Sequence, residues 1–534
     1  MMHTDCTILR SRSIFTGTTK NPLDGMVVLK KNRIADVVPA EAAGQYKNAK
    51  FLDYGDQTIL SAFDDSHMHL LLGAINDRGG FLRDAENEEA AAKLFYESNK
   101  DRKNSKWLLG GAWDHFRWPG CKLPRAETLD RYFPDRCVFL ENKEGHGAWV
   151  NSTTLRYFGI GKDTPDPEFG KYWRDDEGNP TGYLHESAGS SMLNKILKEL
   201  DKNEIADYVR WFIKTAHSLG ICAVSDLQLG GLNPIEVYED MDERGELTIR
   251  LHYSPPLDMP VEEHLALKAK HCGERLRYSG AKEFLDGTPM GYTGLMIDPY
   301  SDMPENRGAP LSDLEKVKAQ VIALDQAGIR SRLHACGDMA VRLGLDFFEE
   351  ARRVNGASGT RHAIEHIEAC NPNDIPRFGK LGVIAAVQPD HLPKYDFANH
   401  PFHAILGGER MRYSWPFRSL LSTGAHIGFG TDYPVAPLNP WRGVFRAVTR
   451  LTDDFQPNGG FSPEEKISLS DALIAYTKGS AYVNEREDEI GTLEAGKYAD
   501  IAILDRNIFS VEPEDLMNVK NAVTFFDGDK VFEQ

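Results

Sequence analysis

The stretch Thr58-Ile59-Leu60-Ser61-Ala62-Phe63-Asp64-Asp65-Ser66-His67-Met68-His69 decides the fold that we predict for this chain. Its apolar first half is typical of a buried strand, which we expect over residues 58–64. Side chains two residues apart on a strand point to the same face, so a strand that continues to residue 69 presents His67 and His69 together. Two such imidazoles can chelate a metal ion, although most histidine pairs with this spacing are ordinary surface or core residues.

The composition limits the class of protein. The formal net charge of −18 argues against a general nucleic-acid binder, because phosphate contacts need clustered Lys and Arg. The seven cysteines are odd in number and widely spaced, without a CxxC, which predicts neither a disulfide framework nor a thiolate zinc site. The N-terminus lacks the features of a signal peptide, and no apolar run has the length of a transmembrane helix. We therefore expect a cytoplasmic protein with a small-molecule partner, no membrane and no nucleic acid; a homodimer is compatible with the sequence.

The two ends of the chain have a similar texture of short strands separated by Gly, Pro, Asn and Lys. Both ends differ from the middle, where apolar strands alternate with amphipathic helices. We predict that residues 1–60 and 485–534 pair into one small β-sandwich domain.

The middle of the chain has the pattern of a parallel α/β architecture. One of its helices is expected over residues 312–327, opened by a capping box of Ser312 and Glu315. Eight strands with helices between them predict an α/β fold of the (β/α)8 TIM barrel class over residues 61–484. The predicted strands are residues 58–64, 221–226, 249–253, 280–285, 329–334, 362–365, 382–387 and 425–430.

One connection is too long for a single crossover. Residues 70–215 follow the first strand and contain strand-like pieces of their own, at 107–114 and 137–140. We interpret them as a subdomain inserted over the mouth of the barrel, where long insertions tend to lie.

Potential metal ligands fall at the ends of five predicted strands. A barrel gathers its functional groups at the carboxyl ends of its strands, so we expect these side chains to lie close together. Their nitrogen and oxygen donors suit Zn, Fe, Mn, Ni or Co. Asp64 and Asp65 are candidates for hydrogen bonds that fix the imidazole tautomers. The set consists of His67, His69, Lys282, His334, His366 and Asp432.

Each member also has an ordinary interpretation. His334 or His366 alone could be a partly buried histidine, and Asp432 could initiate a turn. Lys282 could be a surface lysine with a buried stem. Chance would, however, have to place every group at the catalytic end of its own strand, so the pattern favours a metal centre.

At this point the chain resembles the amidohydrolase superfamily, and within it amidohydrolase family 3, which includes YtcJ-like proteins and N-substituted formamide deformylases. The resemblance extends over nearly the whole chain. The motifs that carry it are Ser66-His67-Met68-His69, Gly111-Ala112-Trp113-Asp114, Gly145-His146-Gly147-Ala148-Trp149-Val150-Asn151, Lys282 with Asp286-Gly287, His334-Ala335-Cys336-Gly337-Asp338, Arg361-His362-Ala363-Ile364-Glu365-His366, Gln388-Pro389-Asp390-His391, Gly430-Thr431-Asp432-Tyr433-Pro434-Val435 and Gly491-Thr492-Leu493-Glu494-Ala495-Gly496-Lys497-Tyr498-Ala499-Asp500.

The resemblance implies a metal-centred barrel, a small β-sandwich built from both termini and hydrolysis at a carbon centre. It also implies that Lys282 is carboxylated with CO2 and bridges two ions. The implied ligands are His67, His69 and Asp432 for one ion, and His334 and His366 for the second.

At some positions the residues differ from those that are usual in the family. The first strand lacks the Pro-Gly pair that usually introduces it, Cys336 stands at a generally aliphatic position, and Glu283 follows the lysine. None of these changes removes a ligand. Cys336 and Glu283 could alter substrate choice.

We therefore predict a metal-dependent amidohydrolase, an enzyme that uses a metal-activated water to hydrolyse a C–N bond other than a peptide bond in an amide, formamide or cyclic imide. The cofactor is one or two divalent ions, with zinc foremost. Asp432 takes a proton from the water and returns it to the leaving nitrogen. The alternatives are a mononuclear deaminase or lactonase-type hydrolase, and a non-catalytic metal-binding or regulatory protein of the same fold.

Four further residues are candidates for substrate binding. His146, in a Gly-His-Gly loop, and His391, after the seventh strand, could hydrogen-bond the substrate carbonyl, since loops at the barrel mouth carry recognition groups. Trp113 and Trp149 could form an aromatic wall of the pocket. Ordinary packing within the inserted subdomain is an equally good interpretation of the tryptophans.

Overall fold

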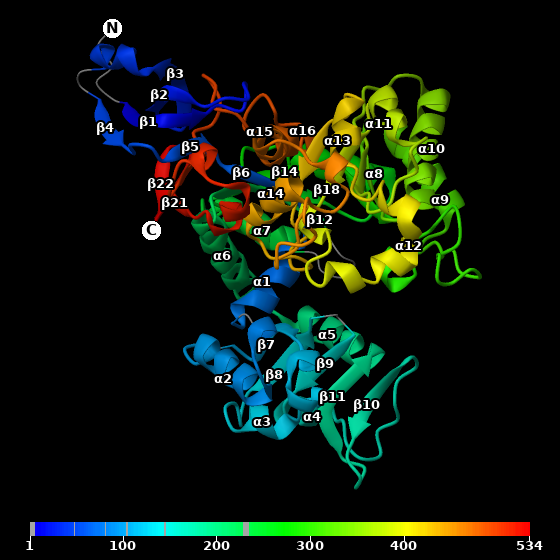
Figure 1. Cartoon of the computed structure of the whole chain (residues 1–534). Coiled ribbons are helices and arrows are strands. Elements are labelled where there is room, and N and C mark those ends of the chain that lie inside the picture. Colours follow the sequence, from blue (N-terminus) through cyan, green and yellow to red (C-terminus); the bar gives the residue numbers. More distant parts are fainter. Residues whose placement is uncertain (1–5, 47–48, 81, 103–104, 144–145, 228–233) are drawn as a thin grey trace. The chain divides into compact units, whose positions relative to one another are not determined.

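The computed structural model describes residues 6–46, 49–80, 82–102, 105–143, 146–227 and 234–534 (Figure 1). Two predictions involve residues outside this range. Residues Met1–Asp5 belong to the N-terminal segment in which we expect no signal peptide, and Gly145 belongs to the Gly-His-Gly loop. In the described part of the chain, no helix is both long and apolar enough to cross a membrane.

The chain divides into two compact units. The larger unit contains residues 1–68, 213–229 and 247–534, and the second contains residues 69–212 and 230–246. Residues 69–212 of the second unit lie in sequence between the first and second strands of the barrel, as the predicted insertion does, whereas residues 230–246 follow the second strand.

Eight parallel strands of the larger unit form a closed cycle. Strands β6, β12 and β13 pair in one sheet, and β15, β16, β17, β18 and β19 pair in that order in another. Parallel bridges between Pro256 and Lys282 and between Met68 and Tyr433 join the two sheets. The predicted α/β barrel fold is therefore confirmed. Its strands are β6 (Phe63–Met68), β12 (Ile221–Leu227), β13 (Arg250–Ser254), β15 (Ala281–Phe284), β16 (Ser331–Ala335), β17 (Ala363–His366), β18 (Ile384–Val387) and β19 (Ile427–Phe429).

Helices follow most of these strands in sequence, as a βα alternation requires. They are α8 (Val261–Lys270), α9 (Leu314–Gln326), α10 (Asp338–Asn355), α11 (Ile375–Leu381), α12 (Phe402–Met411), α13 (Phe417–Ser422), α14 (Pro440–Thr449), α15 (Leu469–Ile474) and α16 (Ser480–Val483). A short strand that we did not predict, β14 (Leu276–Tyr278), pairs with β13.

Helix α9 begins later than predicted, and its capping box is not formed. Asp313 is the N-cap residue, and its carboxylate accepts hydrogen bonds from the backbone N–H groups of Glu315 and Lys316. The Ser312 hydroxyl instead donates to Glu283 at 3.0 Å. Asp313 takes the N-cap position in place of Ser312, because its carboxylate lies one residue closer to the helix and accepts hydrogen bonds from two free N–H groups.

The first predicted strand, 58–64, is in fact two strands. Residues Thr58–Ser61 form β5, which pairs with β1 and β20 in a sheet outside the barrel, and β6 begins at Phe63. The backbone changes partner at Ala62, whose N–H donates to Asp500 O at 2.9 Å, while the N–H of Phe63 donates to Gly220 O at 2.9 Å. One residue therefore separates the terminal sheet from the strand that carries the histidine pair.

The terminal strands form one mixed sheet of eight strands, where we predicted a β-sandwich. Its order is β22-β21-β20-β5-β1-β2-β3, and β4 pairs with β1. Neighbouring residues on β1, Ile8 and Leu9, pack into different apolar clusters, so both faces of the sheet are covered. The remaining strands are β1 (Thr7–Phe15), β2 (Leu23–Lys30), β3 (Arg33–Pro39), β4 (Lys50–Asp53), β20 (Ile501–Leu504), β21 (Asn521–Phe526) and β22 (Asp529–Glu533).

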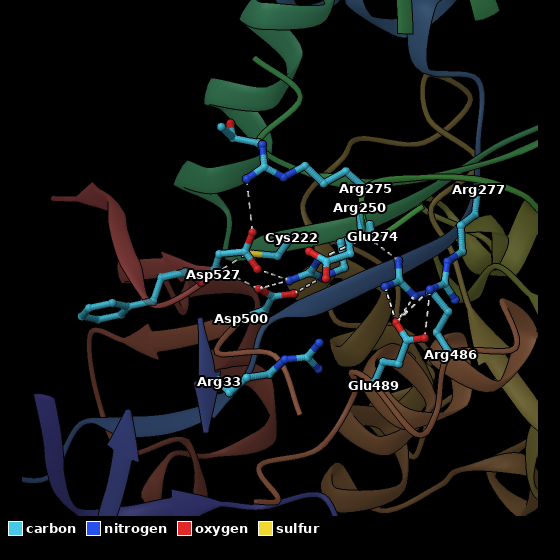
Figure 2. A network of polar contacts seen from close by, with 12 residues as sticks. Arg33, Cys222, Arg250, Glu274, Arg275, Arg277, Arg486, Glu489, Asp500 and Asp527 are labelled. Carbon is cyan, nitrogen blue, oxygen red and sulfur yellow. Dashed lines mark hydrogen bonds and ion pairs between the residues drawn. The ribbon is translucent and has the colours of Figure 1, made fainter. Parts of the chain in front are cut away.

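A buried ion cluster ties the amino end of the barrel to this sheet (Figure 2). Arg250, the first residue of β13, has a fully buried side chain. Its Nε donates to Asp500 at 2.6 Å, and its Nη2 donates to Asp527 at 2.6 Å. The guanidinium also stacks on Tyr498, 3.6 Å from the ring centroid. All three partners belong to the C-terminal segment, so the cluster holds that segment on the barrel.

The second unit contains a five-stranded sheet in the order β10-β11-β9-β8-β7. The predicted strands 107–114 and 137–140 correspond to β7 and β8. The position that we predicted for the insertion, over the barrel mouth, stays a prediction. The elements are β7 (Trp107–Trp113), β8 (Cys137–Asn142), β9 (Gly147–Val150), β10 (Gly170–Arg174) and β11 (Pro180–Glu186), with helices α1 (Leu70–Arg78), α2 (Glu88–Asn99), α3 (Ala126–Asp130), α4 (Ser152–Tyr157), α5 (Ser187–Glu199) and α7 (Ile235–Glu243). Helix α6 (Lys202–Ser218) leads back to the barrel strand β12.

Candidate metal centre

Several predicted ligands lie at the carboxyl ends of the barrel strands. His67 is near the end of β6, His334 is near the end of β16 and His366 ends β17, whereas Lys282 is the second residue of β15. The structure brings potential ligand atoms of three groups within 4.8 Å of one another. These groups are His67 with His69 and Asp432, His334 with Cys336 and His366, and His366 with His391 and Asp432.

A buried carboxylate fixes the orientation of His67. His67 Nδ1 lies 2.7 Å from Glu365 Oε2, and Arg332 Nε donates to Glu365 Oε1 at 2.7 Å. Burial alone would raise the pKa of Glu365, but Arg332 and His67 hold it well below its usual range. Burial, and then Lys282, lower the pKa of His67 to about 4, so the imidazole is neutral. Its Nδ1–H therefore donates to Glu365, which directs Nε2 toward Asp432 Oδ1 at 3.4 Å.

The acidic pair before His67 does not fix the imidazole tautomers as we predicted. The Asp65 carboxylate accepts hydrogen bonds from the backbone N–H groups of Thr431 at 2.9 Å and His67 at 3.2 Å. Asp64 instead contacts the Asn484 amide at 3.3 Å. The Asp64 and Asp65 carboxylates therefore contact Asn484 and backbone N–H groups, whereas Glu365 on β17 reaches the His67 ring.

The backbone at Asp432 is held in a sparsely populated conformation. Its φ is 58°, and that of His366 is 75°, in the left-handed region that few non-glycine residues adopt. Asp432 N–H donates to His67 O at 2.7 Å, which ties the loop after β19 to β6. Such conformations cost about 1–3 kcal/mol each and often occur at functional sites.

Lys282 has an environment unusual for a lysine. Its side chain is buried, and Nζ has no hydrogen-bond partner among the described residues. Burial lowers the pKa of Lys282 to about 8, against the opposing effects of Glu365 and Asp432. A buried ammonium without a hydrogen-bond partner is costly, so Lys282 loses its proton more readily than an exposed lysine does.

His334 and His366 are also buried neutral imidazoles. Burial lowers the pKa of His334 to about 3 and that of His366 well below its usual value, with Lys282 adding to both effects. Their ring centroids are 4.2 Å apart. Within the described residues, Nδ1 of each ring lacks a hydrogen-bond partner.

These residues fit a divalent metal ion. Neutral imidazoles offer lone pairs, Asp432 offers a carboxylate, and the buried unpartnered nitrogens of His334, His366 and Lys282 would be costly without a ligand. The ordinary alternatives, a surface lysine and a turn-initiating aspartate, do not explain this burial.

Three supporting residues escaped the sequence reasoning. Glu365 and Arg332 lie on barrel strands and form the buried pair behind His67. Asp286 accepts hydrogen bonds from the backbone N–H groups of Cys336 at 3.0 Å and Gly337 at 2.8 Å. The signal for Asp286 and Glu365 was a charged residue within or directly after an apolar strand, since such a residue needs a buried partner.

Of the four predicted substrate residues, His391 lies in this centre. Its Nδ1 is 3.4 Å from Glu368 Oε1, and its Nε2 is 3.6 Å from Asp432 Oδ2. His146 belongs to the second unit, where its largely exposed ring lies 3.2 Å from Glu186. The role predicted for His146 stays a prediction.

Trp113 and Trp149 are fully buried in the apolar core of the second unit. The indole N–H of Trp113 donates to Leu140 O, and that of Trp149 donates to Arg125 O, both at 2.9 Å. This environment is that of ordinary packing, the second interpretation given for these residues, and it leaves neither ring a free face for a substrate in this structure.

Comparison with known proteins identifies the family. The amidohydrolase family model matches residues 50–532. Protein LONG AFTER FAR-RED 3 of Arabidopsis thaliana is 30% identical over 95% of this chain and 88% of its own length. An N-substituted formamide deformylase of Arthrobacter pascens is 24% identical over 97% of this chain and 96% of its own length.

Solved structures show the same fold. An uncharacterized metal-dependent hydrolase of Pyrococcus horikoshii is 23% identical with a TM-score of 0.75, covering 95% of this chain and 99% of its own. Atrazine chlorohydrolase TrzN of Arthrobacter aurescens, complexed with zinc, has a TM-score of 0.54 at 16% identity, over 99% of this chain and 95% of its own. From the match to the family model, the chain belongs to amidohydrolase family 3.

Proposed function

We propose that this member of amidohydrolase family 3 is a metal-dependent hydrolase that cleaves a C–N bond of an amide, formamide or cyclic imide in a small molecule. The observation that carries the proposal is the convergence of buried neutral imidazoles, Asp432 and the unpartnered Lys282 amine at one end of the barrel. The choice of a C–N bond draws support from the relative named an N-substituted formamide deformylase.

The residues would hold the cofactor in two groups. We assign His67, His69 and Asp432 to one ion, His334 and His366 to a second, and a carboxylated Lys282 to the bridge between them, with zinc as the proposed metal. A divalent ion held here would lower the pKa of a water that it binds to about 7 and polarise the scissile carbonyl.

Asp432 is the proposed base. One of its carboxylate oxygens lies 3.4 Å from His67 Nε2 and the other lies 3.6 Å from His391 Nε2, so the group lies between two imidazoles. In this position it takes a proton from the attacking water and transfers it to the leaving nitrogen.

His391 is the proposed substrate-orienting group. Glu368 Oε1, 3.4 Å from Nδ1, restricts the orientation of the ring. The other nitrogen, Nε2, has no hydrogen-bond partner among the described residues and can hydrogen-bond a substrate. We propose further that the protein acts in the cytoplasm and forms a homodimer.

The test is the metal content per chain, measured by mass spectrometry on purified protein and on Lys282→Ala. Lys316→Ala, which removes a largely exposed lysine, is the matched control. We expect about two ions in the parent and the control and at most one in Lys282→Ala, followed by turnover in a panel of amides and imides. One ion in all three proteins would favour the mononuclear hydrolase, and none after reconstitution would overturn the proposal.

A further inference from the structure

Cys336 lies inside the candidate metal centre. It follows β16 by one residue, its side chain is 1% exposed, and its Sγ is 3.3 Å from His334 Nε2. Its backbone N–H is held by Asp286 at 3.0 Å, which fixes where the side chain starts. The sulfur, one nitrogen of His334 and one nitrogen of His366 lie within 4.8 Å of one another.

Two other buried cysteines of the larger unit have a different environment. Cys222 donates to Phe525 O at 3.5 Å, and Cys370 donates to Asn371 O at 3.7 Å. Both contacts are weak hydrogen bonds to the backbone, typical of a cysteine that fills a core. Cys336 alone among these three lies beside imidazole nitrogens.

A second observation points to a ligand at this place. His366 is 3% exposed, and its Nδ1 lacks a hydrogen-bond partner in the described part of the chain. Two ligands of one tetrahedral zinc ion, with bonds of about 2.0–2.3 Å, lie about 3.6 Å apart. The 3.3 Å between Sγ and His334 Nε2 is close to that separation.

We propose that Cys336 is a ligand of the ion held by His334 and His366. This inference rests on the proposed function, since it adds a sulfur donor to one half of the same centre. The thiol loses its proton to solvent as the ion binds, and the metal–sulfur bond takes the place of the S–H bond. A thiolate beside two imidazoles selects thiophilic ions such as zinc and cobalt over magnesium and manganese.

His334 can bind a metal through either ring nitrogen, and only one of the two arrangements brings Cys336 onto the ion. Binding through Nε2 places Cys336 on the ion and replaces the 3.3 Å contact of Nε2 with Gly287 O. Binding through Nδ1 keeps that contact and leaves the sulfur off the ion. The two arrangements differ in the atoms bound to the metal, which a spectroscopic measurement reads directly.

The experiment is X-ray absorption at the zinc edge on the full chain loaded with zinc, beside Cys336→Val and the control Cys370→Val. We expect a sulfur neighbour at about 2.3 Å in the parent and the control, in addition to nitrogen and oxygen at about 2.0–2.2 Å, and its loss in Cys336→Val. The cobalt-loaded parent and control should show a thiolate-to-cobalt charge-transfer band in the near ultraviolet that Cys336→Val lacks.

The parent alone decides the question, so a failure of Cys336→Val to fold leaves the test intact. Zinc with nitrogen and oxygen neighbours only would overturn the role of Cys336 while the proposed function stands. Absence of bound metal in the parent would overturn both. Retention of the sulfur signal in a folded Cys336→Val protein would also contradict the assignment.

Discussion

Two buried charged regions of the larger unit are built in opposite ways. At the amino end of β13, the Arg250 guanidinium bonds to the carboxylates of Asp500 and Asp527 (Figure 2). At the carboxyl ends of the strands, Lys282 Nζ and an imidazole nitrogen of His366 have no hydrogen-bond partner among the residues described.

The difference separates a structural cluster from a functional one. A buried charge that finds its partners within the fold holds elements together, whereas buried polar atoms left without partners are rare and call for a ligand. Loss of a group should therefore affect stability at the Arg250 cluster and chemistry or metal binding at the carboxyl end. The following predictions test this contrast.

The largest effect is expected for Asp432→Asn. Loss of the base should reduce kcat by about 10²–10⁴-fold on any substrate found in the panel, while bound metal falls far less. The matched control is Asp325→Asn, another aspartate beside a histidine, 3.1 Å from His362 at the opposite end of β17. Assays of kcat and metal content on both proteins provide the check, and equal activity in the two variants would contradict the role of Asp432.

The next effect concerns stability. Arg250→Ala leaves the buried Asp500 carboxylate without its guanidinium partner and Asp527 with Arg275 alone, and it should lower the free energy of unfolding by about 3–5 kcal/mol, with metal content unchanged. Urea unfolding measures the change. Arg353→Ala, which removes the exposed partner of Glu350, should leave the midpoint near that of the parent. A large loss of metal in Arg250→Ala would contradict the prediction that this cluster affects stability alone.

A smaller effect is expected for Glu365→Gln. The amide side chain of this variant has no negative charge to fix the His67 tautomer, and it leaves the charge of Arg332 without its partner. We therefore expect the metal affinity to fall by about 10–100-fold. Competition with a chelator measures the affinity. Glu283→Gln, whose carboxylate contacts Ser312, is the control that should keep parental affinity. Unchanged affinity in Glu365→Gln would show that His67 needs no anionic partner.

The last prediction concerns pH, and its effect is the smallest over a single pH unit. Burial raises the pKa of Asp64 to about 7, so the folded protein keeps a proton that the unfolded chain releases near pH 4. Stability from this group is therefore present at low pH and falls as pH rises to about 7, by at most about 1.4 kcal/mol per pH unit. Asp64→Asn should remove this contribution in urea titrations of metal-loaded protein. Asp65 and Asp286, with pKa values also raised to about 7, would keep part of the slope.

Sequence reasoning located the candidate ligands because their positions follow two local rules. Alternation along a strand and the gathering of groups at the strand ends placed His67, His334 and His366 in one region. The partner of His67 could not be found in this way. Glu365 is far away in sequence, and its contact depends on the register in which β16 and β17 pair.

The division of the first strand and the environment of the tryptophans could not be predicted, for a common reason. The run from Thr58 to Phe63 is buried throughout, so its apolar pattern does not reveal that the partner strand changes at Ala62. A buried tryptophan, likewise, has the same sequence signature in a core as in a pocket. Only the packing of Trp113 against Trp118 and Trp149 shows which environment it occupies.

The pairing of β5 with β20 has a consequence for synthesis on the ribosome. Ser61 pairs with Ile501, which is translated more than four hundred residues later. At about 5–20 residues per second, β5 waits tens of seconds for that partner, with one edge open to other chains. Because only Ala62 separates β5 from β6, the strand that bears His67 waits beside it. Nascent chains therefore need protection from aggregation until the final strands have emerged.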